Sequence, residues 1–138
     1  MVSPPTDIPR QAGEQLCSAA RAVQQRAYAP ASNFRVGAAV LADDGQIFVG
    51  CNVENASYGL TICAERAAVC AAVAGGVRNI RAVAVVTDLL EPARPCGACR
   101  QVLAEFGPQM VVYLLGQNDV VQTTQLAQLL PDPFVFPR

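Results

Sequence analysis

Histidine and lysine are absent from this sequence, and all ten basic residues are arginine. Without lysine there is no Schiff-base or P-loop lysine, and without histidine there is neither a Ser-His-Asp triad nor a histidine metal ligand. Acid–base chemistry in this chain must therefore come from a carboxylate, a thiol, a tyrosine or a bound metal.

Long apolar runs and local concentrations of charge are also missing. The apolar stretches, such as residues 67–74, fall well short of the roughly 18–20 residues that a membrane span needs. The N-terminus lacks the basic region and the apolar run of a signal peptide. Ten basic and eleven acidic residues give a net charge of −1, with no basic stripe to bind phosphates. We expect a cytoplasmic protein that binds neither membranes nor nucleic acid.

The chain has 138 residues, of which 52% are hydrophobic, so we expect a single domain over residues 1–138 with its own core. Residues 1–7 are expected to be flexible. Apolar periodicity and turn residues predict helices over 8–28, from a Thr61 cap to 74, over 95–106 and over 125–130. Strands are predicted over 36–41, 46–54, 80–86 and 110–115 and from 120 onwards. This alternation, with hairpins at both ends, predicts an α/β domain with a mixed sheet.

Six cysteines are the most informative residues, and without a signal peptide they are expected to be metal ligands or small core residues rather than disulfides. Cys96 and Cys99 are three apart and share a helix face, while Cys63 falls in the first turn of the preceding helix. Both helices follow a strand, so their N-termini can lie along one sheet edge and bring three sulfurs together. The other three cysteines are expected to be buried core residues: Cys17, Cys51 and Cys70.

Three thiolates select zinc, and three protein ligands with an open fourth position are typical of a catalytic zinc site. Cys70 lies two helical turns beyond Cys63, about 10 Å away, and cannot bind the same ion. Two alternatives remain open. One is a closed structural site with Cys51 as the fourth ligand, and the other is a redox dithiol made by Cys96 and Cys99.

Two charged residues beside Cys63 suit such a zinc site. Side chains in a first helical turn lean back over the N-terminus, so Glu65 can reach the same cleft and carry protons. Zinc with three thiolates is formally −1, and Arg66 lies on the same face as Cys63, where it can draw charge from the sulfurs. Asn52 and Glu54 share one strand face, but their spacing leaves open whether they bind a ligand or end the strand.

Four motifs in order resemble the small homotetrameric zinc-dependent cytidine deaminases: residues 29–39 (APASNFRVGAA), 50–59 (GCNVENASYG), 61–66 (TICAER) and 95–101 (PCGACRQ). The resemblance spans nearly the whole chain. It implies a three-layer α/β/α sandwich around a mixed five-stranded sheet. It also implies a hydrolase with one Zn²⁺ per chain that deaminates cytidine and 2′-deoxycytidine to uridine and 2′-deoxyuridine, releasing ammonia in pyrimidine salvage.

The resemblance also implies roles for individual residues. Cys63, Cys96 and Cys99 would hold zinc, and Glu65 would carry protons to the ring N3 and the departing amine. Arg66 would hydrogen-bond the thiolates. The implied substrate-binding residues are Phe34 on the pyrimidine, the Ala64 N–H on its carbonyl, Asn52 and Glu54 on the ribose, and Tyr58 and Phe134 from neighbouring subunits.

The resemblance places the tail, residues 131–138, at a subunit interface. Ala31 departs from it, because the family usually has tyrosine there; this bears on packing near Phe34 and not on the chemistry. Other readings are a deaminase of another cytosine nucleoside, of the blasticidin type, and a non-catalytic zinc-stabilised scaffold. A nucleic-acid deaminase would need a basic surface, which the net charge of −1 disfavours.

Overall fold

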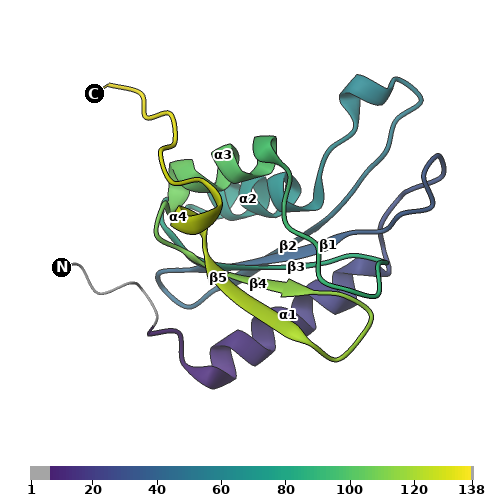
Figure 1. Ribbon diagram of the computed structural model, residues 1–138. Helices are drawn as coiled ribbons and strands as arrows, with labels where there is room; N and C mark the ends of the chain where they lie inside the picture. The colour runs from purple at the N-terminus through teal and green to yellow at the C-terminus, as the bar shows by residue number, and fades with distance from the viewer. Residues whose placement is uncertain (1–6, 138) are drawn as a thin grey trace.

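The computed structural model describes residues 7–137, so residues 1–6 of the segment expected to be flexible lie outside the described residues (Figure 1). Asp7 is described, and its carbonyl accepts a hydrogen bond of 3.0 Å from Arg81 Nη2. Among the described residues, no helix has the length and apolar character that crossing a membrane requires.

One mixed sheet forms the centre of the fold, with its strands in the order β2-β1-β3-β4-β5. The strands are β1 (Gly37–Ala42), β2 (Ile47–Cys51), β3 (Ile80–Val86), β4 (Val111–Leu115) and β5 (Val121–Gln125). β3 and β4 pair in parallel, and the other neighbours pair antiparallel. The predicted mixed sheet with a hairpin at each end is therefore confirmed.

Helices cover both faces of this sheet, as the three layers in Figure 1 show. α1 (Arg10–Gln24) packs on one face, and α2 (Ala64–Ala74), α3 (Gly97–Phe106) and α4 (Leu126–Leu129) lie on the other. The connection between β2 and α2, residues 52–63, is called the arm here, and it carries a short 3-10 helix, η1 (Tyr58–Leu60). The expected α/β/α sandwich is confirmed.

Two apolar cores fill the spaces between the layers. In β1, Ala38 and Val40 belong to the core under α2 and α3, while Ala39 and Leu41 belong to the core under α1. This alternation follows from the period of two along a strand. A central strand buried on both faces reads as a continuous apolar run, which is why β3 could be recognised in the sequence.

Several predicted boundaries differ from the observed ones. α1 ends at Gln24 rather than at Tyr28, because the Tyr28 backbone pairs with Asn52 and Glu54 in an extended bridge. β2 ends at Cys51 for the same reason, since the chain beyond it leaves β1 and pairs with Tyr28 and Ile62. Pairing between distant segments has overridden local propensity at each of these points.

The starts of the two site helices also shift. Thr61 ends η1 and does not cap α2, whose N-cap residue is Cys63. α3 has Cys96 as its N-cap and begins at Gly97 rather than at Pro95. The prediction for Cys70 is wrong, because the buried stripe of α2 contains Ala68, Val69 and Ala72, and Cys70 is exposed on another side.

α2 lies so close to β2 that only glycine fits at position 50. A Cβ on Gly50 would lie 2.4 Å from Ala68 N and 2.6 Å from Ala64 O, both backbone atoms. Gly50→Ala is therefore expected to lower the free energy of unfolding by about 1–3 kcal/mol, as overpacking does, measured by urea denaturation. Gly59→Ala is the control, because no described atom lies within 4 Å of the added Cβ. Equal stability of the two variants would contradict the close approach.

Candidate active site and metal centre

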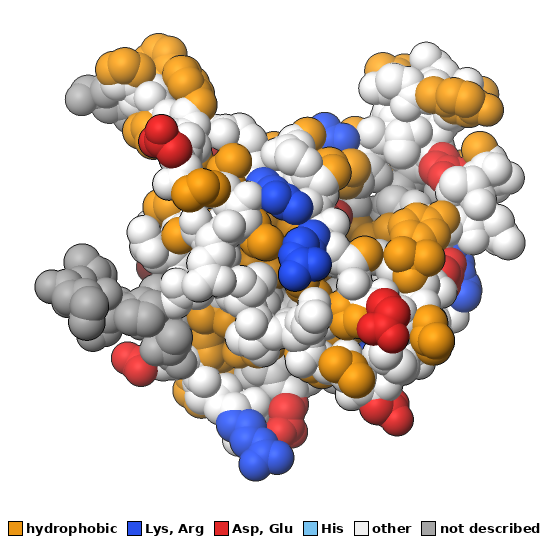
Figure 2. Space-filling model, in the orientation of Figure 1, with side chains coloured by type: hydrophobic (Ala, Val, Ile, Leu, Met, Phe, Trp, Pro, Cys, Tyr) orange, Lys and Arg blue, Asp and Glu red, His pale blue; other side chains and the backbone are white. Residues whose placement is uncertain are grey.

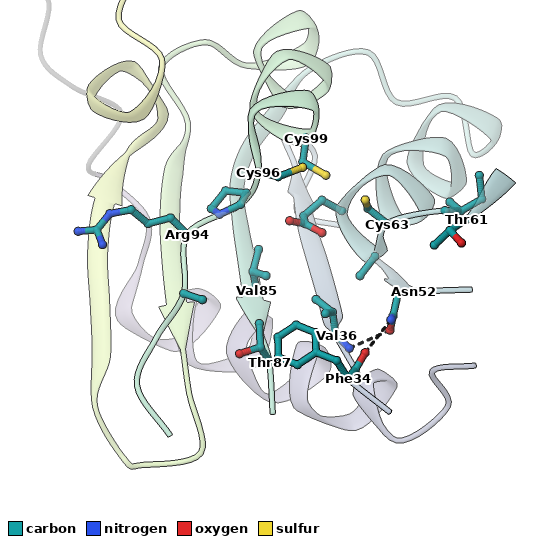
Figure 3. A pocket seen from close by; sticks show the side chains of 15 residues that line it. Phe34, Val36, Asn52, Thr61, Cys63, Val85, Thr87, Arg94, Cys96 and Cys99 are labelled. Carbon is teal, nitrogen blue, oxygen red and sulfur yellow. Dashed lines mark hydrogen bonds between the residues drawn. The ribbon is translucent and has the colours of Figure 1, made fainter. Parts of the chain in front are cut away.

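The candidate site is a cavity of about 280 Å³ at the N-terminal ends of α2 and α3 (Figure 3). Its lining brings together Phe34, Asn52, Ala64 and Glu65 with the three cysteines of the predicted zinc site. Both helices follow strands, and this connectivity places their first turns at the same edge of the sheet. Seven residues predicted from four separate motifs thus surround one space.

The sulfurs of Cys63, Cys96 and Cys99 all lie within 4.8 Å of one another. Cys63 and Cys96 reach this position as the N-cap residues of α2 and α3, and Cys99 lies within the first turn of α3. Within residues 7–137, this group of possible metal ligands consists of these three cysteines alone. Cys51 is half-buried on β2 and does not belong to it, which counts against a closed structural site with Cys51 as fourth ligand. The donor set fits zinc with an open coordination position.

Arg66 places a positive charge beside these sulfurs. Its Nη2 donates to Cys63 Sγ over 3.4 Å and to the Thr61 carbonyl over 3.4 Å. Its Nε is buried and has no partner among the described residues. A guanidinium in contact with a ligating sulfur draws electron density from it, as the expected role of Arg66 requires.

The thiols of Cys96 and Cys99 differ in their electrostatic surroundings. Backbone N–H groups at Cys99 and Ala98 lower the pKa of the Cys96 thiol, as expected at a helix N-terminus. Burial, followed by the charge of Glu65, raises the pKa of the Cys99 thiol. A coordinated cation reverses this balance, because a coordinating thiol loses its proton outright.

Glu65 is the buried carboxyl group of the cavity, with 5% of its surface exposed. Burial raises the pKa of Glu65 above its ordinary value, while hydrogen bonds from its own backbone N–H and from the Cys99 thiol oppose this shift. A carboxyl group in such surroundings can hold a proton and release it within the cavity.

Asn52 and Phe34 lie on the opposite side of the cavity from the three cysteine sulfurs (Figure 3). Asn52 Nδ2 donates to the Phe34 carbonyl over 2.9 Å, and its Oδ1 accepts from the Val36 N–H over 2.8 Å. Asn52 therefore ties the segment that carries the Phe34 ring to the end of β2.

Glu54 and Tyr58 border a neighbouring cavity of about 420 Å³ instead. The two cavities adjoin at Thr61, which lines both. The Glu54 carboxylate accepts hydrogen bonds from the Ala31 and Ser32 N–H groups and from the Ser32 hydroxyl, and the hydroxyl is the largest cause that lowers the pKa of Glu54. Within this chain Glu54 holds the loop before Phe34.

Phe134 lies apart from both cavities. It is 69% exposed in the C-terminal tail, where its carbonyl accepts a 3.0 Å hydrogen bond from Gln101 Nε2. Tyr58 is 78% exposed on the arm that carries η1. Figure 2 shows both segments as protrusions with hydrophobic side chains, the tail at the upper left and the arm at the upper right.

Sequence reasoning missed the residues that form the far wall of the cavity and its support. Thr87 lines the cavity directly after β3, and Asp88 and Gln24 hydrogen-bond the segment behind Phe34. Two signals could have revealed them. Polar residues directly after a buried strand mark a sheet edge where ligands bind, and Gln24 is a polar residue in the apolar stripe of Leu16 and Ala20.

Residues 10–115 match the family described as "Cytidine and deoxycytidylate deaminase zinc-binding region". A protein from Sporosarcina psychrophila named cytidine deaminase is 49% identical over 122 residues, which cover 88% of this chain and 90% of the relative. A blasticidin-S deaminase from Bacillus cereus is 27% identical over 104 residues, covering 70% of this chain and 74% of the relative.

The fold also matches a crystal structure of cytidine deaminase from Burkholderia pseudomallei, with a TM-score of 0.84 and 51% identity. The match covers 88% of this chain and 98% of that protein. The matched region contains the arm, the helices α2 and α3 and all three clustered cysteines. The chain therefore belongs to the cytidine and deoxycytidylate deaminase family and carries that family's zinc-binding region.

Proposed function

We propose that this enzyme hydrolyses cytidine and 2′-deoxycytidine to uridine and 2′-deoxyuridine with release of ammonia, in pyrimidine salvage. The observation that carries the proposal is the cavity in which three clustered sulfurs and the buried Glu65 face Phe34 and Asn52. Relatives named cytidine deaminase that are about half identical over most of the chain give independent support.

The chain supplies the metal ligands and a proton carrier. Cys63, Cys96 and Cys99 would hold one zinc ion, which when bound activates water for attack on C4 of the cytosine ring. Glu65 would take a proton from the attacking water and give it to the ring N3; it would then take the proton of the hydroxyl added at C4 and deliver it to the departing amino group, which leaves as ammonia. Arg66 holds the Cys63 sulfur and offsets part of the charge of the three thiolates.

Other residues orient the substrate. Ala64 is the first residue of α2, and the N–H groups of a first helical turn lack intrahelical acceptors, so this donor can bind the pyrimidine carbonyl. Phe34 packs on the ring. Asn52 would bind a ribose hydroxyl through the second hydrogen of its Nδ2, and Glu54 through carboxylate lone pairs that its bonds to Ala31 and Ser32 leave free.

Turnover and metal content test the proposal together. The purified protein is expected to contain one zinc per chain and to decrease the ultraviolet absorbance of cytidine. A protein that deaminates blasticidin S and not cytidine would favour the other nucleoside-deaminase reading. Bound zinc with four protein ligands and no turnover would favour the scaffold. This chain is 49% identical to a cytidine deaminase and 27% identical to the blasticidin-S deaminase, which supports cytidine as the substrate.

We also propose a homotetramer in which neighbouring subunits complete each cleft. The support is the exposure of Tyr58 on the arm and of Phe134 and Phe136 in the tail, since large apolar groups on protrusions favour association.

The proposed location is the cytoplasm. Six free thiols fit a cytoplasmic location, where disulfides are rare.

Light scattering is expected to give four times the 14.5 kDa chain mass. Of two single variants, Phe134→Ala is expected to raise the KM for cytidine, because that ring reaches a neighbour's cleft, and Phe136→Ala to leave it near the wild-type value. An active, well-behaved monomer would contradict the shared cleft. A raised KM for Phe136→Ala alone would transfer the role to that ring.

A further inference from the structure

Phe34 and Val36 line the cavity, Arg35 between them does not, and all backbone polar groups of these three residues are hydrogen-bonded. Phe34 N–H donates to Ser32 Oγ over 3.0 Å, and the Phe34 carbonyl accepts from Asn52 Nδ2 over 2.9 Å. Val36 bonds Asn52 through both its N–H (2.8 Å to Oδ1) and its carbonyl (3.2 Å from the Asn52 N–H). Side chains make five of the six hydrogen bonds to this backbone, and the Asn52 N–H makes the sixth.

The middle residue, Arg35, is held by two side chains outside the motifs already described. Its N–H donates to Asp88 Oδ2 over 2.8 Å, and its carbonyl accepts from Gln24 Nε2 over 3.1 Å. Gln24 Nε2 also donates to Asp88 Oδ1 over 3.3 Å, which joins the two supports to each other. Gln24 and Asp88 thus fix both backbone polar groups of the residue that follows Phe34.

The placement of Gln24 depends on a close helix–strand contact. A Cβ on Gly37 would lie 2.2 Å from the Ala20 carbonyl and 2.8 Å from the Gln24 N–H nitrogen, so only glycine lets α1 lie this near β1. Gln24 is 2% exposed, and a buried amide is costly unless it is hydrogen-bonded. Burial and bonding together leave Gln24 little freedom to move.

Asp88 connects this support to a second part of the cavity wall. It directly follows Thr87, which lines the cavity beside Phe34 (Figure 3). Asp88 also forms a salt bridge with Arg35 Nη2 at 3.3 Å, but this pair is partly exposed, and such pairs contribute little. The bonds to the Arg35 backbone are the ones that fix the wall.

We infer that Gln24 and Asp88 are positioning residues that hold the Phe34 wall at the distance at which its ring packs on the pyrimidine. The inference rests on the proposed function. Neither residue touches the substrate; each acts through the backbone of Arg35. A displaced wall weakens packing on the ring equally in the ground state and the transition state, and this raises KM with little change in kcat.

The test compares Asp88→Ala and Gln24→Met with the wild-type protein, using cytidine as the substrate. Losing a bond to the partly buried Arg35 backbone is expected to raise KM roughly ten-fold, with kcat within about two-fold. Zinc content is expected to stay at one per chain. Asp88→Asn keeps one oxygen for the Arg35 N–H and is expected to recover most of the loss.

Two matched variants separate the backbone contacts from the surface contacts. Gln25 Oε1 accepts from the Arg35 side chain, at Nη1, over 3.3 Å and not from the Arg35 backbone, so Gln25→Ala is expected to keep the wild-type KM. Arg35→Ala removes the salt bridge and keeps both backbone bonds, and its KM is expected to stay within about two-fold. If Arg35→Ala raised KM as much as Asp88→Ala, the salt bridge would be responsible and the inference would fail.

Hydrogen–deuterium exchange over residues 33–37 gives a readout that needs no substrate. Faster exchange is expected in Asp88→Ala and Gln24→Met and unchanged exchange in Gln25→Ala. Unchanged KM and exchange in the first two variants would overturn the inference while wild-type turnover still supported the proposed function. A parallel fall of kcat, zinc content and melting temperature would also overturn it, because that pattern indicates a general loss of structure. Absence of cytidine turnover by the wild-type protein would instead refute the proposed function itself.

Discussion

Glu65→Gln is expected to lower cytidine turnover by a factor of about 10²–10⁴ while one zinc per chain is retained. Glutamine has nearly the same shape as glutamate, so the buried position beside the sulfurs stays filled. Its amide cannot give a proton to N3 or to the departing amine. The loss is expected in kcat, because proton transfer occurs in the transition state. Steady-state kinetics and metal analysis of the same preparation measure both quantities.

Glu91→Gln is the matched control for this variant. Glu91 is an exposed carboxylate on the loop between β3 and α3 and does not line the cavity. Its amide variant is expected to keep wild-type turnover. Near-normal turnover of Glu65→Gln would refute the proton-carrier role, and loss of zinc from it would show that Glu65 acts by holding the metal site together.

Cys99→Ala is expected to abolish zinc binding and cytidine turnover together. Cys99 is 1% exposed, and its sulfur lies within 4.8 Å of the other two. Residues that merely orient metal ligands cost about 10–100-fold in affinity when removed, and a ligand is expected to cost more. Metal content after dialysis against a chelator, together with the turnover rate, checks this result.

Cys51→Ala and Cys70→Ala are the controls, since neither sulfur belongs to the cluster and Cys70 is exposed. Both are expected to keep one zinc and wild-type turnover. A Cys51→Ala protein without zinc would restore the closed structural site with four sulfur ligands. Full zinc content in Cys99→Ala would remove that residue from the ligand set.

The metal cluster could be predicted from the sequence because local geometry determines it. A spacing of three places Cys96 and Cys99 on one side of a helical turn, and a strand before each helix brings Cys63 to the same edge. Glu65 and Arg66 follow from the same reasoning, since both lie in the first turn after Cys63. The layered α/β fold follows from alternating apolar runs.

Contacts between distant segments could not be predicted in this way. Tyr28 leaves its helix to pair with residues after β2, and Glu54 turns to the Ala31–Ser32 backbone instead of the zinc cavity. Gln24 reads as one polar position in an apolar helix face, and only the approach of α1 to Gly37 shows what it bonds. Each of these depends on tertiary packing that no local pattern records.

The two helices that meet at the cavity begin in an unusual manner. Cys63 and Cys96 occupy the N-cap positions of α2 and α3, yet neither makes a side-chain cap hydrogen bond. An oxygen side chain at such a position ordinarily stabilises a helix by roughly 0.5–2 kcal/mol. Both sulfurs belong instead to the cluster of three that would hold zinc. Zinc held by these sulfurs would therefore also stabilise the first turns of α2 and α3, so its removal would weaken the fold as well as end turnover.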